Sequence, residues 1–259
     1  MRLAAVQTNL FWEDAKANYK HIQQQLKAVS NVDLIVLPEM FPSGFSMNPS
    51  SISESENGPS LKWMRTLAKS KNAVVVGSVA VYRQKKYYNS LFWVSPNGEY
   101  SCYNKKHLFT MAGEHKHYSK GDNLLLTTIS SFKCCPLICY DLRFPVWSRN
   151  INTDLSFKYD LLIYVANWPS VREDAWTTLL KARAIENQCY VIGVNRVGKD
   201  GNGVSYSGES RIFGPKGERL DSFKANKEQV EIVELDRSVL EKFRLEFPAN
   251  SDADNFEII

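Results

Sequence analysis

The sequence predicts a layered α/β fold, in which helices cover the faces of β-sheets. Strand-like and helix-like segments alternate along its 259 residues, as they do in folds that stack helices on sheets. Apolar residues make up 44% of the chain, which supplies a large core and argues against disorder. Because no linker, low-complexity stretch or repeat divides it, we expect one domain over 1–259, with an extended C-terminal tail from about residue 245.

The first half of the chain alternates strands with helices. Apolar residues at helical spacing predict amphipathic helices over about 13–29 and 60–71. Continuous apolar runs predict buried strands at 3–7, 34–37 and 74–79. The segment 43–59 is rich in Ser, Pro, Gly and Asn, and is therefore predicted to be a loop.

The second half begins with a hairpin and continues with further strands. The turn Pro96-Asn97-Gly98 predicts a hairpin between strands 88–94 and 100–103. The segment 104–123 has no clean period, which is typical of a long functional loop. One more helix is expected at 175–187. The remaining strands are expected at 132–138, 161–166, 190–195, 208–213 and 229–235.

Charge and cysteine content exclude several classes of protein. The net charge is +4 with acids and bases mixed, so no basic stripe predicts a nucleic-acid partner. No apolar run approaches the roughly 18 residues of a membrane span, and no signal peptide is expected. Five cysteines, an odd number with no framework spacing, predict reduced thiols in the cytoplasm.

Four polar side chains come directly after apolar strands: Glu39, Lys105, Cys139 and Asn167. Ligands of open α/β sheets gather at the carboxyl ends of the strands, so these side chains could converge on one pocket. A carboxylate, an ammonium and a thiol are the groups that acyl transfer to a thiol requires. Each also has a plainer interpretation: Glu39 and Lys105 as solvated charges, and Cys139 as a structural thiol. A charged turn follows Cys139, which favours the functional interpretation.

Taken together, four segments resemble the motifs of the carbon–nitrogen hydrolase (nitrilase) superfamily, in the same order and over almost the whole chain. The segments are 37–41 for the glutamate motif, 105–109 for the lysine motif, 138–145 for the cysteine motif and 183–187 for a helix motif with structural charges. The resemblance implies a four-layer αββα sandwich of two mixed β-sheets flanked by helices, commonly as a homodimer. It also implies a Glu39-Lys105-Cys139 triad, with Lys105 chosen over Lys106 by its distance from His107.

Within this superfamily, the segments 139–150 and 165–169 look like the bacterial omega-amidase branch. That branch hydrolyses the terminal amide of 2-oxo dicarboxylic acid monoamides, such as 2-oxoglutaramate and 2-oxosuccinamate, to the acid and ammonia. Glu114 resembles a second glutamate often found near the triad. The small-molecule amide is the partner that this resemblance implies.

The mechanism implied by the resemblance passes through a thioester on Cys139. Glu39 would accept the thiol proton as general base. Lys105 and the backbone N–H of Tyr140 would hold the oxyanion, and Glu114 would position Lys105 or tune Glu39. This mechanism requires no metal and no organic cofactor.

An anionic substrate calls for a cation, and Arg143 is the candidate because it lies four residues past the nucleophile. The alternative is that Arg143 pins the turn through a salt bridge, for instance to Asp141. Five further side chains could wall the pocket beside Tyr140, although each fits a plain structural role as well: Phe41, Phe45, Met111, Asn167 and Trp168.

Several rival functions remain open from the sequence. His115 and His117 have the spacing of two zinc ligands on a strand, although no strand-like context surrounds them. A binding protein without turnover would have lost a triad residue, and none is lost. A nitrilase, a carbamoylase or an acyltransferase of the same superfamily is a further alternative.

Overall fold

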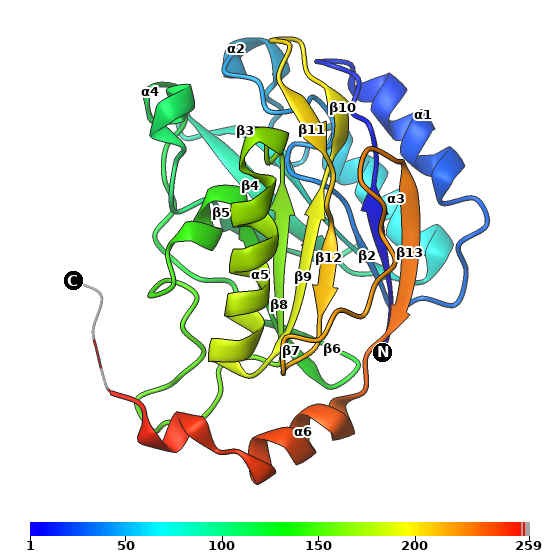
Figure 1. Cartoon of the computed structure of the whole chain (residues 1–259). Coiled ribbons are helices and arrows are strands. Elements are labelled where there is room, and N and C mark those ends of the chain that lie inside the picture. The colour runs from blue at the N-terminus through cyan, green and yellow to red at the C-terminus, as the bar shows by residue number, and fades with distance from the viewer. Residues whose placement is uncertain (255, 257–259) are drawn as a thin grey trace.

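Two mixed β-sheets packed face to face form the centre of the computed structural model, which describes residues 1–254 and 256 (Figure 1). The six-stranded sheet has the order β13 (Gln229–Glu234), β1 (Arg2–Gln7), β2 (Leu34–Val36), β3 (Val74–Arg83), β4 (Lys86–Val94), β5 (Tyr100–Asn104). The five-stranded sheet has the order β12 (Arg211–Phe213), β9 (Tyr190–Asn195), β8 (Leu161–Ala166), β7 (Phe132–Ile138), β6 (Thr127–Ile129). In each sheet three parallel strands lie at the centre and antiparallel strands close the edges.

Helices α1 (Ala15–Gln25) and α3 (Pro59–Lys71) cover the outer face of the six-stranded sheet. Strand β1 shows how the sequence specifies this layering. Ala4 and Val6 pack in the cluster that includes the apolar residues of α1 and α3, whereas Leu3 and Ala5 face the second sheet. This alternation buries both faces of the strand, which explains its continuous apolar run.

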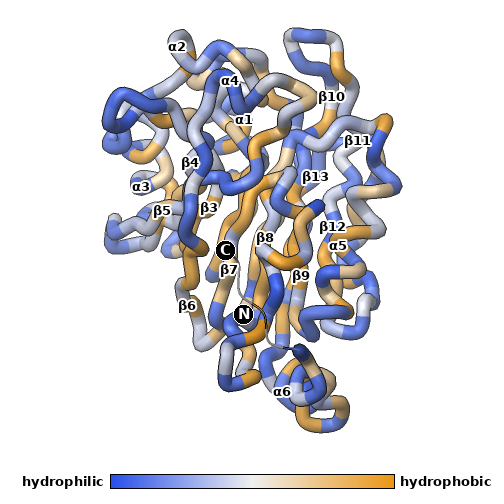
Figure 2. Tube along the Cα trace, turned by 90° about the vertical axis from the view of Figure 1, so that its left-hand side faces the viewer, coloured by the Kyte–Doolittle hydropathy of each residue, from blue (hydrophilic) through white to orange (hydrophobic). Residues whose placement is uncertain are grey.

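Helix α5 (Glu173–Asn187) covers the outer face of the five-stranded sheet, whose central strands carry a dense run of apolar residues (Figure 2). Gly193 on β9 allows the close approach of this helix, because a Cβ at that position would lie 2.3 Å from the Leu180 side chain. The predicted layered α/β fold, with two mixed sheets flanked by helices, is confirmed. None of the helices in the described part of the chain is both long and apolar enough to cross a membrane.

Several short elements lie in segments that were expected to be irregular. The predicted loop 43–59 contains the one-turn helix α2 (Pro49–Ile52). The predicted loop 104–123 contains the 3₁₀ helix η1 (Thr110–Ala112) and α4 (Glu114–His117). Strands β10 (Val197–Lys199) and β11 (Ser205–Ser207) form a separate antiparallel hairpin that the sequence analysis missed. Such short elements lack enough residues to show a period.

The C-terminal segment is not simply an extended tail. Helix α6 (Arg237–Glu246) begins where the Asp236 side chain accepts a hydrogen bond from the Ser238 N–H. A 3₁₀ helix, η4 (Ala249–Asp252), then interrupts the expected extended backbone. The rest of the tail prediction falls partly on residues 255 and 257–259, which lie outside the described residues.

Candidate active site

Three charged side chains from distant segments meet in a buried cluster. The Lys105 Nζ lies 2.9 Å from Glu39 Oε1 and 3.0 Å from Glu114 Oε2, and all three side chains are fully buried. Glu39 follows β2, Lys105 follows β5, and Glu114 is the first residue of α4. Burial alone would lower the pKa of Lys105, but the charges of Glu114 and Glu39 outweigh it and raise this pKa, so the ammonium stays charged.

Glu39 is held by donors on both of its carboxylate oxygens. Asn89 Nδ2 donates to Oε1 at 2.8 Å, and the backbone N–H of Asn167 donates to Oε2 at 2.8 Å. The Asn167 side chain also donates to the Glu39 carbonyl at 2.6 Å. These contacts fix the direction of the Glu39 carboxylate.

The Asn89 amide bridges the two carboxylates, because its Nδ2 also lies 3.5 Å from Glu114 Oε1. Sequence analysis missed this residue. Asn89 lies inside β4 and not at a strand end, so no turn or motif marked it.

Cys139 sits at the junction of β7 and the 3₁₀ helix η2 (Cys139–Arg143). Its φ is +42°, in the left-handed region that a residue with a side chain rarely adopts, at a cost of about 1–3 kcal/mol. This backbone carries the thiol off the strand toward the cavity, and the sulfur lies 4.0 Å from the Asn167 carbonyl. Strain held at one residue that bears a nucleophile is typical of a functional site.

The Cys139 thiol is neutral at rest. Burial and the nearby charge of Glu39 raise its pKa well above the ordinary value, although the Lys105 charge acts in the opposite direction. Because the thiolate is the reactive form, the thiol must lose its proton as it attacks. The charge of Glu39 acts on this thiol, so a base is available beside it.

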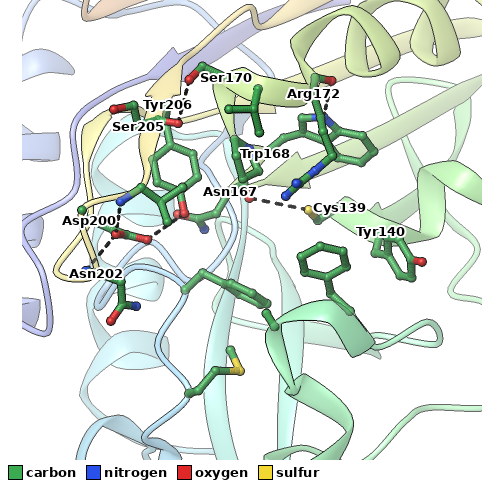
Figure 3. Close-up of a pocket in the computed structure, with 18 of the residues that line it drawn as sticks. Cys139, Tyr140, Asn167, Trp168, Ser170, Arg172, Asp200, Asn202, Ser205 and Tyr206 are labelled. Carbon is green, nitrogen blue, oxygen red and sulfur yellow. Dashed lines mark hydrogen bonds between the residues drawn. The ribbon is translucent and has the colours of Figure 1, made fainter.

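A cavity of about 710 Å³ opens beside Cys139 (Figure 3). Seven of the expected site residues line it: Phe45, Lys105, Cys139, Tyr140, Arg143, Asn167 and Trp168. Figure 3 shows Cys139, Tyr140, Trp168 and Arg172 on one side, with the β10–β11 hairpin forming the other. The cavity thus reaches from solvent to Cys139 and to Lys105 of the charged cluster.

Two predicted wall residues do not line the cavity, so these predictions were wrong. Phe41 is fully buried in the layer between the six-stranded sheet and its helices, in aromatic contact with Trp63. Met40, with φ of +43°, breaks the strand-like alternation that would place Phe41 on the same side as Glu39. Met111 is 81% exposed and is not among the residues that line the cavity.

Arg143 lines the cavity. It forms no salt bridge with Asp141, so it does not fix the turn in the way that the alternative interpretation proposed. The Arg143 guanidinium lies 4.9 Å above the Trp168 ring. Asp141 instead accepts hydrogen bonds from the Tyr103 hydroxyl at 2.7 Å and the His107 backbone N–H at 3.0 Å. These contacts join the lysine and cysteine motifs and fix the turn without Arg143.

The structure does not place His115 and His117 as the alternative zinc site would require. His115 and His117 lie on α4, where alternate residues do not share a face as they would on a strand. Glu114, the nearest carboxylate in sequence, is bound to Lys105. Within residues 1–254 and 256, no group of three or more His, Cys, Asp or Glu side chains is placed to hold a metal ion.

Glu114 should take up a proton at a higher pH than an ordinary glutamate. Burial raises the pKa of Glu114 above its ordinary value of 4.5, more than Lys105 lowers it, and Glu39 adds to the rise. Activity should therefore fall as the pH drops through this raised pKa. In Glu114→Gln we expect a rate about ten- to a hundredfold lower and the loss of this acid limb, because the group that takes up the proton is gone. The measurement is kcat/KM across the acidic range; an acid limb that stays in place would contradict its assignment to Glu114.

Fold and site together define a hydrolase that acts on amide C–N bonds, built on a sandwich of two sheets. The chain belongs to the carbon–nitrogen hydrolase family, whose sequence model matches residues 2–245. Omega-amidase YafV of Escherichia coli (strain K12) is 43% identical over 258 residues, which cover 100% of this chain and 98% of that protein. The 2-oxoglutaramate amidase of Bacillus subtilis (strain 168) is 34% identical over 75% of this chain and 74% of its own.

Among solved structures, XC1258 from Xanthomonas campestris superposes with a TM-score of 0.96 at 37% identity, covering 100% of this chain and 99% of that chain. It is a CN-hydrolase superfamily protein whose structure holds an arsenic adduct in the active site. Nit3 from Saccharomyces cerevisiae, a member of branch 10 of the nitrilase superfamily, superposes with a TM-score of 0.85 at 25% identity, over 96% of this chain and 94% of that chain.

Proposed function

We propose that this protein hydrolyses the terminal amide of 2-oxo dicarboxylic acid monoamides, such as 2-oxoglutaramate and 2-oxosuccinamate, through a thioester on Cys139. The observation that carries the proposal is the buried Glu39-Lys105-Glu114 cluster beside Cys139, a residue with a strained backbone that lines an open cavity. Similarity to Escherichia coli omega-amidase and to Bacillus subtilis 2-oxoglutaramate amidase supports this choice of substrate.

In the first half-reaction the Cys139 sulfur attacks the amide carbonyl carbon while Glu39 takes the thiol proton. Lys105 lines the cavity and donates toward the developing oxyanion. The backbone N–H of Tyr140 is a second donor, because the first N–H groups of a helix have no acceptor within it. Glu39 then gives the proton to the nitrogen, the C–N bond breaks, and ammonia leaves a thioester.

In the second half-reaction water replaces the thiol. Glu39 takes a proton from water, the hydroxyl adds to the thioester carbonyl, and the C–S bond breaks to release the acid. The proton held by Glu39 returns to the Cys139 sulfur, which restores the neutral thiol. Glu114 takes no proton in this scheme; it positions Lys105, and the Phe109 N–H at 2.6 Å holds Glu114 in turn.

The far end of the substrate carries a carboxylate, and Arg143 is placed to bind it. Its guanidinium lies at the cavity wall, oriented by the Trp168 ring. A guanidinium binds a carboxylate through two parallel hydrogen bonds, which adds geometric selection to charge. Phe45, Asn167 and Trp168 would enclose the chain between the two ends.

A panel of substrates tests the proposal most simply. We expect kcat/KM to be highest for 2-oxoglutaramate and 2-oxosuccinamate, and at least about tenfold lower for glutamine, a nitrile and a carbamoyl amino acid. Glutamine carries an ammonium in place of the 2-oxo group, and the other two compounds replace the amide that Cys139 attacks. Ammonia release measured for each compound decides the order. A higher value for the nitrile or the carbamoyl compound would make the protein a nitrilase or a carbamoylase instead.

We also propose that the protein acts as a homodimer in the cytoplasm. Apolar side chains at the ends of α5 and α6 are exposed: Ile185, Leu245 and Phe247. Covering such side chains favours association. All five cysteines are free thiols in the structure, and a reactive thiol is preserved best in a reducing compartment.

A further inference from the structure

The cavity beside Cys139 carries an excess of positive charge. Arg143 and Arg172 both line it, and Asp200 is the carboxylate in the same lining. Asp200 is already engaged, since it accepts the Tyr206 hydroxyl at 2.9 Å and two backbone N–H groups of its own hairpin. In the described part of the chain neither guanidinium forms an ion pair, so their charge is available to a ligand.

Each of the two arginines at this cavity lies over an aromatic ring. Arg143 lies 4.9 Å above the ring of Trp168, and Arg172 lies 5.3 Å above the ring of Phe109. The Trp168 indole N–H donates to the Arg172 carbonyl at 2.7 Å, which fixes the backbone of Arg172 (Figure 3). Aromatic faces orient a guanidinium and leave its N–H groups free at the edge.

The free donors distinguish these two residues from the structural arginines of the fold. Arg183, Arg196 and Arg244 each donate hydrogen bonds to backbone carbonyls or carboxylates, and they pin segments together. Within residues 1–254 and 256, the structure shows no such bond from the side chain of Arg143 or Arg172. Their donors therefore remain for solvent or for a bound anion.

We propose that Arg172 is a second specificity-determining residue, which acts with Arg143 to bind the 2-oxo carboxylate end of the substrate. This inference rests on the proposed function. A 2-oxo carboxylate presents three acceptor oxygens, and one guanidinium fork engages two of them. Two guanidinium groups beside one cavity can bind all three, which selects 2-oxo acids over simple carboxylic acids and neutral amides.

The test compares 2-oxoglutaramate with valeramide, a neutral amide of similar length. For Arg172→Met, we expect the ratio of kcat/KM for 2-oxoglutaramate over valeramide to fall about ten- to a hundredfold. Arg172→Lys, which keeps the charge but not the fork, should fall less. Arg65→Met is the matched control, because Arg65 also lies above an aromatic ring, that of Tyr100, but outside this cavity. Its ratio should equal that of the unmodified protein.

The outcomes separate this inference from the proposed function. If the unmodified protein does not hydrolyse 2-oxoglutaramate, the proposed function fails. If it does, and Arg172→Met leaves the ratio unchanged, the inference on Arg172 is overturned while the function stands. Because the ratio is taken within one protein, a variant that merely folds less well lowers both values and leaves it unchanged.

Discussion

Cys139→Ala is expected to abolish amide hydrolysis, with a loss in kcat/KM on the order of 10⁴ or more, because the proposed mechanism forms its covalent intermediate on this thiol. The side chain is small and 9% exposed, so its removal should leave the fold intact. Cys139→Ser should be nearly as inactive, since a hydroxyl gives up its proton far less readily than a thiol to Glu39. Ammonia release and thermal unfolding, measured on the same samples, check both statements.

Cys102→Ser is the matched control for these variants. Cys102 lies half-buried on β5, outside the cavity lining, and burial raises its pKa to about 11. It should keep its activity within about threefold, as surface and rim substitutions away from a site usually do. Substantial amide hydrolysis by Cys139→Ala would remove the thiol from the mechanism.

Lys105→Met is expected to cost both activity and stability. Loss of an oxyanion donor alone lowers kcat by about 10²–10³. The change also leaves Glu39 and Glu114 buried together without their counter-charge, and breaking a buried pair in this way costs about 3–5 kcal/mol. Lys106→Met is the control, because Lys106 pairs at the surface with Asp122 and should change little.

The pH dependence of the stability of Lys105→Met shows whether the variant is destabilised by the lost ammonium charge or by altered packing. Without the ammonium, the raised pKa of Glu114 rises further, so the variant becomes more stable as the pH falls and the carboxylates take up a proton. Adding Glu114→Gln to Lys105→Met should restore much of the stability and none of the activity. A double variant as unstable as Lys105→Met would contradict the account of buried charge.

The position of reactive side chains at the carboxyl ends of strands explains how much of this site could be predicted. Glu39, Lys105 and Cys139 each follow a strand, and the structure brings them to one edge of the two sheets, as expected of ligand-binding residues in open α/β sheets. Nothing in the local sequence pattern marks Glu114 as a site residue. It could be predicted only from its resemblance to a glutamate of the family. Its position depends on the one-turn helix α4, which is too short to show a period.

What could not be predicted depends on contacts between distant segments. Asn89 looks like any polar residue inside a strand until β4 lies opposite Glu39. Phe41 was misplaced because a single left-handed residue, Met40, reverses the direction of its side chain. Arg172 is the last residue of the short 3₁₀ helix η3 (Ser170–Arg172), and its approach to Phe109 joins two segments far apart in the sequence, so the local sequence pattern did not mark it as a site residue.

The acyl-enzyme itself is the most direct test of the central claim. The protein is mixed with saturating 2-oxoglutaramate, quenched with acid during turnover, digested and examined by mass spectrometry. We predict that the peptide containing Cys139 gains the mass of the substrate less ammonia, and that this gain is absent from Cys139→Ala. An acyl group on another residue, or an unmodified Cys139 peptide while acid and ammonia accumulate, would contradict the thioester mechanism.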